Sequence, residues 1–300
     1  MRVSPVGEVI PKFGSAVRIG MGCASLGSRI GAAASARALI AAHEAGVNWY
    51  DVAPAYGLGE AEILLGGFLD GRRETVRVTT KVGIGPPERL RLMKRIYALG
   101  RPALGLVSGL RGAFRSIKAT RNGHLPLDPG LIEASLSRSL KRLRTDYVDV
   151  FALHDPLPEH VLREDILRVL ERVVARGQAR AIAVAGTAEA CRAALDAPRI
   201  YDVLQMSVAH FREDRARFGS SGKTIVLHSV FGVDGALDQV GKQEPRAVAA
   251  ERLLSEALTE NPHGIVLASM ASAAHLEANL AVARAVDRPQ RDEAPWRATA

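Results

Sequence analysis

The sequence predicts an α/β protein built as a closed barrel of eight parallel strands, a (β/α)₈ TIM barrel with an N-terminal hairpin. Short runs of β-branched residues alternate about eight times with longer segments rich in Ala, Leu and Arg, which is typical of βα units in a parallel sheet. The length of 300 residues and the hydrophobic content of 47% suit one such barrel with a large core. We therefore expect residues 1–300 to form a single domain.

Each predicted strand is a short apolar run, and each predicted helix follows a strand with amphipathic spacing. The strands are expected at residues 16–22, 47–51, 76–81, 147–154, 181–185, 203–206, 224–228 and 264–268. The helices are expected at residues 33–45, 60–69, 129–143, 159–176, 188–195, 210–216, 246–260 and 273–285. Gly46 and Gly177 follow helices as terminating glycines, and Asp128 precedes Pro129 as an N-cap.

Three segments lie outside this alternation. The opening residues alternate around Gly7 and are expected to form the hairpin. Residues 82–127 form a long connection with several glycines and prolines, and a connection of that length inside a barrel is usually functional. Residues 286–300 form a short C-terminal tail.

Composition narrows the class of protein. No uninterrupted apolar run of about 18 residues is present, and the first residues carry charges and prolines where a signal peptide would be apolar. We therefore expect a cytoplasmic protein that does not bind membranes, and two cysteines fit that compartment. The absence of a Cys/His cluster at ligand spacing predicts no metal site.

The net charge of +8 is unevenly distributed, because residues 88–121 hold nine basic residues and one acid. A solvated basic surface and a site for an anionic substrate or partner are both open interpretations. Nucleic acid is not expected, because aromatic residues that would stack on bases are scarce in this segment.

Four residues with proton-transfer chemistry follow three neighbouring strands. Asp51, Lys81 and His154 end the second, third and fourth predicted strands, and Tyr56 lies five residues beyond Asp51. The carboxyl ends of barrel strands meet at one mouth, where strands are about 4.8 Å apart. These four side chains are therefore expected to meet.

Together they would suit the protonation of a carbonyl oxygen. Tyr56 would donate the proton if Lys81 lowered its pKa from about 10, while Asp51 held Lys81 in place and His154 oriented the oxygen. Three alternatives remain open: each residue has a purely structural role, Lys81 is a Schiff-base nucleophile in a lyase, or the barrel is a binding or regulatory subunit.

Several segments resemble the aldo-keto reductase superfamily. They are VNWYDVAPAYGLGEAEILLG, TTKVG, SLSRSLKRLRTDYVDVFALHDP and LEANL. The resemblance implies a (β/α)₈ barrel, a nicotinamide cofactor extended across its C-terminal mouth, and a catalytic tetrad of Asp51, Tyr56, Lys81 and His154. It also implies an NAD(P)-dependent oxidoreductase that interconverts a small aldehyde, ketone or lactol and the corresponding alcohol.

The resemblance also assigns cofactor contacts to residues later in the chain. Gln205 matches the glutamine that binds the nicotinamide carboxamide, and His228 occupies the position of an aromatic ring that stacks on the nicotinamide. Ser229, Phe231 and Gly232 match the pyrophosphate loop, and Asn279 matches an asparagine that contacts adenine.

Other cofactor positions depart from the pattern of the superfamily. Ala185 and Gly186 replace a Ser-Asn pair that holds the carboxamide. Ser269 and His275 stand where basic residues would clamp the 2′-phosphate of NADP. The resemblance therefore implies NAD or NADP, with NAD at least as suitable, and these departures favour the alternative of a catalytically impaired barrel.

Overall fold

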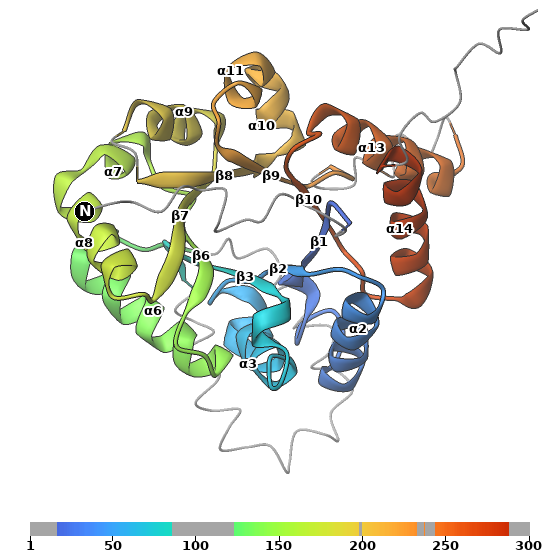
Figure 1. Cartoon of the computed structure of the whole chain (residues 1–300), viewed down its shortest axis with the longest axis horizontal. Coiled ribbons are helices and arrows are strands. Elements are labelled where there is room, and N and C mark those ends of the chain that lie inside the picture. The colour runs from blue at the N-terminus through green and yellow to red at the C-terminus, as the bar shows by residue number, and fades with distance from the viewer. Residues whose placement is uncertain (1–16, 86–122, 198–199, 233–236, 238–243, 288–300) are drawn as a thin grey trace, which may run out of the picture.

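The chain folds into a closed barrel of eight parallel strands surrounded by helices, as the computed structural model shows (Figure 1). The structure describes residues 17–85, 123–197, 200–232, 237 and 244–287. The strands close in the order β1-β10-β9-β8-β7-β6-β3-β2. They are β1 (Ile19–Gly22), β2 (Trp49–Asp51), β3 (Arg77–Val82), β6 (Val148–His154), β7 (Ala179–Ala185), β8 (Tyr201–Ser207), β9 (Thr224–His228) and β10 (Ile265–Ala268). This arrangement confirms the predicted (β/α)₈ barrel, while the predicted N-terminal hairpin lies outside the described residues.

The helices cover the outside of the barrel between successive strands. They are α2 (Ala32–Glu44), α3 (Glu60–Phe68), α6 (Pro129–Leu143), α7 (Pro158–Leu162), α8 (Glu164–Ala175), α9 (Ala188–Asp196), α10 (Val208–Glu213), α11 (Arg215–Gly219), α13 (Arg246–Glu260) and α14 (Ala273–Asp287). The side chain of Asp128 accepts a hydrogen bond from the amide of Leu131, which confirms the predicted N-cap of α6. In the described ranges, none of these helices has the length and apolarity needed to span a membrane.

Two predicted helices are each divided in two. The segment 159–176 contains α7 and α8 because Arg163 is extended (φ −68°, ψ 121°) between them. Its guanidinium donates to both carboxylate oxygens of Asp165, each over 2.8 Å, which holds the break in place. The segment 210–216 is divided between α10 and α11 at Asp214 (φ −148°, ψ 47°). The prediction of continuous helices was wrong because no glycine or proline marks either break.

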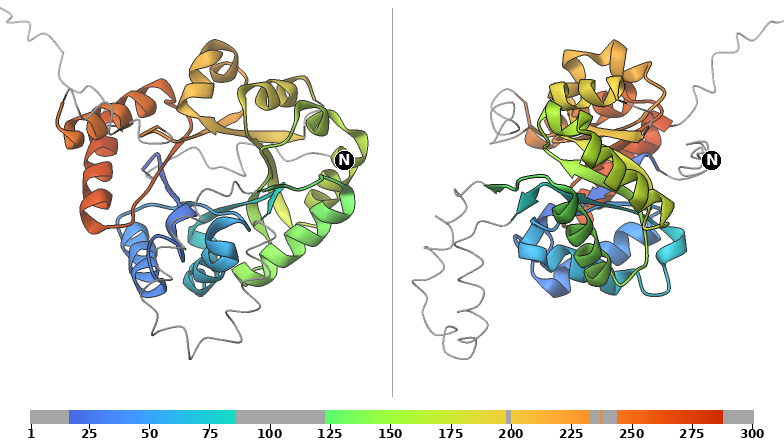
Figure 2. Two further views of the ribbon diagram at one scale, coloured as in Figure 1. Left: turned by 180° about the vertical axis from the view of Figure 1, so that it is seen from behind. Right: turned by 90° about the vertical axis from the view of Figure 1, so that its left-hand side faces the viewer.

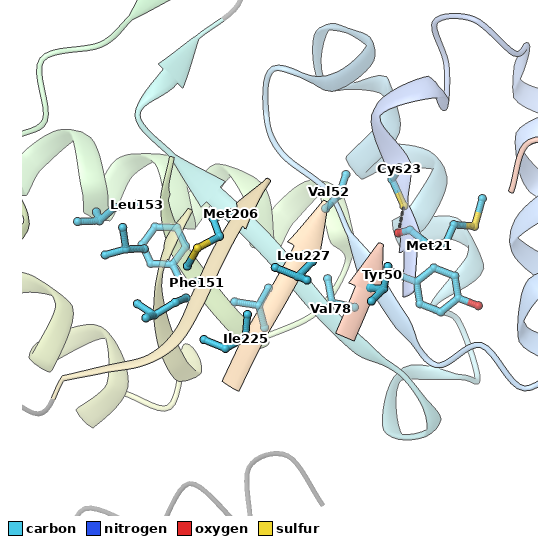
Figure 3. Packing of buried hydrophobic residues seen from close by; sticks show 14 of the residues in the cluster. Met21, Cys23, Tyr50, Val52, Val78, Phe151, Leu153, Met206, Ile225 and Leu227 are labelled. Atoms are coloured by element: carbon cyan, nitrogen blue, oxygen red, sulfur yellow. Dashed lines mark hydrogen bonds between the residues drawn. The ribbon is translucent and has the colours of Figure 1, made fainter. Parts of the chain in front are cut away.

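The strands pack apolar side chains on both faces. Along β2, Trp49 lies in the cluster inside the barrel, while Tyr50 packs in the outer cluster between strands and helices. Figure 3 shows Tyr50 in that outer cluster beside Met21 and Val78. Because side chains alternate along a strand, Asp51 returns to the side of Trp49.

A short two-stranded sheet stands at the C-terminal end of the barrel. Strands β4 (Ile84–Gly85) and β5 (Gly123–His124) pair antiparallel, and they project beyond the barrel in the side view of Figure 2. They form the two ends of the long predicted connection 82–127, and residues 86–122 lie outside the described part of the chain.

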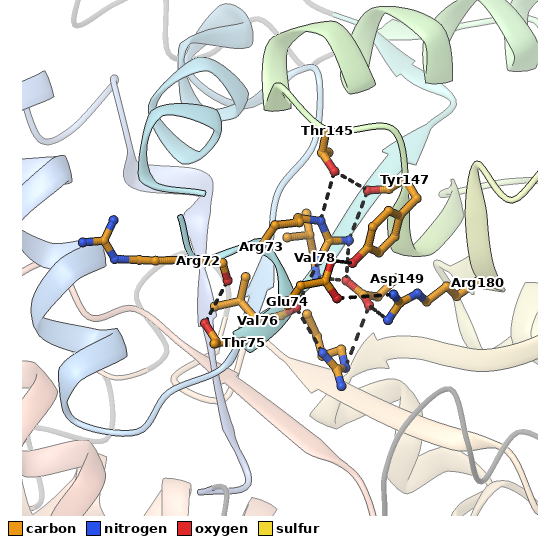
Figure 4. A network of polar contacts seen from close by, with 11 residues as sticks. Arg72, Arg73, Glu74, Thr75, Val76, Val78, Thr145, Tyr147, Asp149 and Arg180 are labelled. Atoms are coloured by element: carbon orange, nitrogen blue, oxygen red, sulfur yellow. Dashed lines mark hydrogen bonds and ion pairs between the residues drawn. The ribbon is translucent and has the colours of Figure 1, made fainter. Parts of the chain in front are cut away.

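A cluster of polar and charged side chains surrounds Asp149 at the start of β6 (Figure 4). Asp149 is 1% exposed and accepts hydrogen bonds from Arg73 (2.8 Å), Arg180 (3.2 Å) and the amide of Val78 (2.9 Å). The guanidinium carbons of Arg73 and Arg180 lie 3.8 Å and 4.2 Å, respectively, from the ring centroid of Tyr147. These contacts satisfy a buried carboxylate at the N-terminal end of the barrel, where residues of this fold usually serve stability.

Candidate active site

Lys81 connects the predicted proton-transfer residues at the C-terminal end of the barrel. Its ammonium donates hydrogen bonds to a carboxylate oxygen of Asp51 and, over 3.2 Å, to the hydroxyl of Tyr56. The rings of Tyr56 and His154 meet edge to face, with centroids 6.2 Å apart. The structure therefore brings together all four residues that the sequence placed at this mouth.

Strand alternation directs Lys81 toward the mouth. The preceding residue, Thr80, faces outward and donates a 2.8 Å hydrogen bond to the buried carboxylate of Glu62 on α3. Arg142 of α6 donates to the other oxygen of that carboxylate over 2.9 Å. Thr80 is thereby fixed against the helices, and its neighbour Lys81 is directed to the opposite side of the sheet.

Tyr56 is placed by a tight turn between β2 and α3. It begins a short 3₁₀ helix, η2 (Tyr56–Gly59), in which Gly57 and Leu58 have φ angles of 55° and 59°. A Cβ atom on Gly57 would lie 2.6 Å from the carbonyl oxygen of Leu26, so only glycine fits there. This turn holds the phenol of Tyr56 over Lys81, whose nitrogen is 5.1 Å from the ring centroid.

The charges around Lys81 set the protonation of its neighbours. Burial of Lys81 acts against its charge, but Asp51 and Tyr56 together raise its pKa above the usual value. Burial also raises the pKa of Tyr56, and the positive charge of Lys81 opposes that rise without cancelling it. The predicted net lowering of the Tyr56 pKa was therefore wrong for the free protein. At neutral pH, Lys81 is charged and Tyr56 keeps its proton.

His154 is neutral in this environment. Burial and the nearby positive charge of Lys81 lower its pKa well below the usual value. Its Nδ1 atom is buried and has no hydrogen-bond partner among the described residues. A neutral imidazole carries one N–H donor and can orient a polar ligand without adding charge.

The four residues Asp51, Tyr56, Lys81 and His154 line a cavity of about 540 Å³. Most of the sequence-predicted cofactor residues line it: Gln205, His228, Ser229, Phe231, Gly232 and Ser269. Two predicted cofactor residues do not. His275 is exposed on α14, and the side chain of Asn279 donates a 3.3 Å hydrogen bond to the backbone oxygen of Ser269.

Gln205 and Ser229 have properties that suit a polar ligand. Gln205 is 3% exposed, and its side-chain amide forms no hydrogen bond within the described ranges. Ser229 has a φ of 55°, and its hydroxyl lies 2.9 Å from Nδ1 of His228. Burial and the charge of Lys81 lower the pKa of His228 to about 4, so this ring is also neutral.

The cavity also includes residues that the sequence analysis did not single out. Arg29, Asp155 and His210 line it. Asp155 directly follows His154, so its position after a strand end could have identified it, but Arg29 and His210 lie in segments without a motif. Cys23 also lines the cavity, but its side chain is fully buried and burial raises the pKa of its thiol, which favours packing over chemistry. Within the described ranges, no group of three His, Cys, Asp or Glu side chains could hold a metal ion.

Comparison with known proteins places the chain in one family. The profile of the Aldo/keto reductase family matches residues 18–217. The chain therefore belongs to this family, as its motifs predicted. It is 34% identical to a D-threo-aldose 1-dehydrogenase of a Pseudomonas species, over 55% of this chain and 49% of the relative. It is 28% identical to an NADH-specific methylglyoxal reductase of Escherichia coli, over 56% of this chain and 43% of the relative. These matches span less than half of each relative.

Solved structures share the same fold. An aldo-keto reductase of Bacillus halodurans in its holo form superposes with a TM-score of 0.66 at 17% identity, covering 88% of this chain and 86% of that one. An aldo-keto reductase of Klebsiella pneumoniae in complex with NADPH gives a TM-score of 0.63 at 19% identity, covering 92% and 93%.

Proposed function

We propose that this protein is an NAD(P)-dependent oxidoreductase that interconverts a carbonyl group and an alcohol, with Tyr56 as general acid and base. One observation carries the proposal: the ammonium of Lys81 contacts both Asp51 and the Tyr56 hydroxyl at a cavity that His154 also lines. Membership of the Aldo/keto reductase family supports it.

The cavity suits the nicotinamide end of such a cofactor. When bound, the cofactor supplies or accepts the hydride. The side-chain amide of Gln205 would hold the carboxamide, and the backbone amides of Val230 and Phe231 would face phosphate oxygens. Ala185 has only a methyl side chain and Gly186 has none, so the end of β7 would leave room for a planar ring.

The proton chemistry follows from the protonation states of Tyr56, Lys81 and His154. Tyr56 holds its proton at neutral pH and can give it to an oxygen on which negative charge develops. Lys81 then stabilises the tyrosinate that remains, because a nearby cation favours the charged form. The neutral His154 would donate a hydrogen bond to the same oxygen and orient it.

The Schiff-base alternative is disfavoured by the environment of Lys81. An amine nucleophile must lose its proton, whereas the Asp51 carboxylate raises the pKa of Lys81 above the usual value. We therefore assign Lys81 an electrostatic role rather than a covalent one.

We propose that the protein uses NAD at least as well as NADP. Ser269 and His275 are both exposed, and neither has the permanent charge that would pair with a 2′-phosphate. The NADH-specific relative from Escherichia coli supports this assignment. Fluorescence titration with both reduced cofactors tests it, and binding of NADPH at least about tenfold tighter than NADH, about 1.4 kcal/mol, would contradict it.

For the substrate, we propose a small aldehyde, ketone or lactol. The named activities of the two relatives, on an aldose and on methylglyoxal, support this class. Arg29 places a cationic side chain in the cavity, which supports the expectation that some substrates are anionic.

A screen of aldehydes, lactols and alcohols with both cofactors, followed by nicotinamide absorbance, tests the proposed activity. For any active pair, Tyr56→Phe is expected to reduce kcat by at least about 100-fold, as for loss of a general acid, while cofactor binding is retained. A variant with unchanged kcat would refute the role of Tyr56. Failure of the wild-type protein to bind either cofactor would instead favour a binding or regulatory subunit.

A further inference from the structure

Three neighbouring strand ends are joined in a row beside the cavity. The backbone amide of Asp155, just after β6, donates to the carbonyl of Ala185 at the end of β7 over 2.6 Å. The amide of Gly186 donates to the carbonyl of Gln205 on β8 over 3.0 Å. Asp155 and Gln205 therefore lie on either side of the end of β7, and both line the cavity.

The end of β7 contributes no polar side chain between them. A Cβ atom on Gly186 would lie 3.3 Å from both the Cα of Asp155 and the Cδ of Pro156. It would also lie 3.5 Å from Oδ1 of Asp155. The carboxylate thus lies within van der Waals contact of the point where a side chain at position 186 would begin.

The backbone holds Asp155 in this position. Its φ of 54° lies in the left-handed region, which Asp and Asn adopt more readily than other non-glycine residues. The side chain is 41% exposed, and its Oδ2 lies 3.6 Å from Nε2 of His124 on β5. This contact involves only one of the two carboxylate oxygens, so Oδ1 remains on the side of Gly186.

We infer that Asp155 binds the nicotinamide end of the cofactor together with Gln205 and favours its oxidised form. This inference rests on the proposed function. A primary carboxamide both donates and accepts hydrogen bonds; the carboxylate of Asp155 can accept from its NH₂ group, and the amide of Gln205 can donate to its oxygen. The oxidised ring carries a positive charge that the reduced ring lacks, so a nearby carboxylate stabilises the oxidised form selectively.

Equilibrium binding of the oxidised and reduced cofactors to Asp155→Asn tests this inference without relying on turnover. Asparagine keeps the size and tolerates the left-handed conformation, so the substitution removes the charge alone. We expect the Kd for NAD⁺ to rise about fivefold, the factor for a charge pair screened as in water, and the Kd for NADH to change by less than about twofold. If the wild-type protein prefers the phosphorylated cofactors, NADP⁺ and NADPH are compared instead.

The matched control is Asp70→Asn, an exposed carboxylate between α3 and β3 at the opposite end of the barrel. It changes the net charge equally and is expected to leave both dissociation constants unchanged. The inference is wrong, while the proposed function stands, if Asp155→Asn behaves like this control or weakens the binding of both cofactor forms equally. The same holds if the substitution alters only the KM of a substrate. If the wild-type protein binds no nicotinamide cofactor, both are wrong.

Discussion

The ammonium of Lys81 lies 3.2 Å from the hydroxyl oxygen of Tyr56, and it also donates a hydrogen bond to the carboxylate of Asp51. Lys81 is 1% exposed and Asp51 is 3% exposed, so solvent contributes little to their stabilisation. The cation that would stabilise a tyrosinate therefore depends on one buried carboxylate. Substitutions of Asp51 and Lys81 can therefore separate what this ion pair contributes to stability from what it contributes to catalysis.

Replacing Asp51 should affect both properties. Asp51→Asn leaves the ammonium of Lys81 buried without a counter-charge, and we expect the free energy of unfolding to fall by about 3–5 kcal/mol. Activity should fall as well, because the Lys81 pKa would drop and the cation beside Tyr56 would be lost. Urea denaturation at pH 7 measures the first effect, and kcat with the best substrate from the screen measures the second.

The double variant Asp51→Asn/Lys81→Met separates the two effects. It removes both charges, so it is expected to regain most of the lost stability while remaining inactive. A double variant as unstable as Asp51→Asn alone would show that the uncompensated charge of Lys81 is not the cause.

The Asp149 cluster should contribute to stability and not to activity. Asp149→Ala removes the carboxylate that accepts from Arg73 and Arg180, and we expect a loss of about 2–3 kcal/mol in the free energy of unfolding. Because the cluster lies at the N-terminal end of the barrel, kcat/KM measured well below the melting temperature should not change. Asp196→Ala, which breaks an exposed 2.8 Å ion pair with Arg217, is the control and should change stability by less than about 1 kcal/mol. A comparable loss in the control, or a fall in kcat/KM for Asp149→Ala, would contradict this division.

Gly83 is expected to set the position of His154. It has a φ of 132°, and a Cβ atom there would lie 2.5 Å from the carbonyl oxygen of His154. Gly83→Ala should therefore displace the end of β6, lower the free energy of unfolding by about 1–3 kcal/mol and reduce kcat by at least about tenfold. Gly71→Ala is the control, because it has a φ of 70° but no atom near the added Cβ. If the two variants lost equal activity, close contact with His154 would not explain the effect.

The sequence was sufficient to predict the barrel and the meeting of Asp51, Lys81 and His154. Both rest on local regularities, namely the alternation of strands and helices and the position of each residue at a strand end. The sign of the Tyr56 pKa shift could not be predicted, because it depends on how deeply the fold buries the phenol. The break at Arg163 was also missed, since it rests on a side-chain contact with Asp165.

The cavity was therefore only partly predictable. Asp155 directly follows a strand end, but Arg29 reaches the cavity from a turn before α2 and His210 from helix α10, and no motif marks either of them. Conversely, His275 and Asn279 were assigned to the cofactor by resemblance, and the structure does not place them on this cavity. Residues at strand ends are easier to place from sequence than residues in the turns and helices around the mouth.

The folded protein should lose stability in mild acid. Burial lowers the pKa of His228 in the folded protein to about 4, whereas an unfolded histidine titrates near about 6.5. Between these values the unfolded chain binds more protons, so the free energy of unfolding should fall as the pH drops from about 6.5 to about 4. His154, with its pKa also lowered, acts in the same direction. Because the ring of His228 is half-buried, we expect its share of the loss between pH 7 and pH 5 to be about 1 kcal/mol after solvent screening.

Urea denaturation at both pH values measures this loss. The difference between the two free energies of unfolding should be smaller for His228→Gln than for the wild-type protein. His263→Gln, at an exposed histidine away from the cavity, should keep the wild-type difference, and an unchanged difference in His228→Gln would refute the assignment.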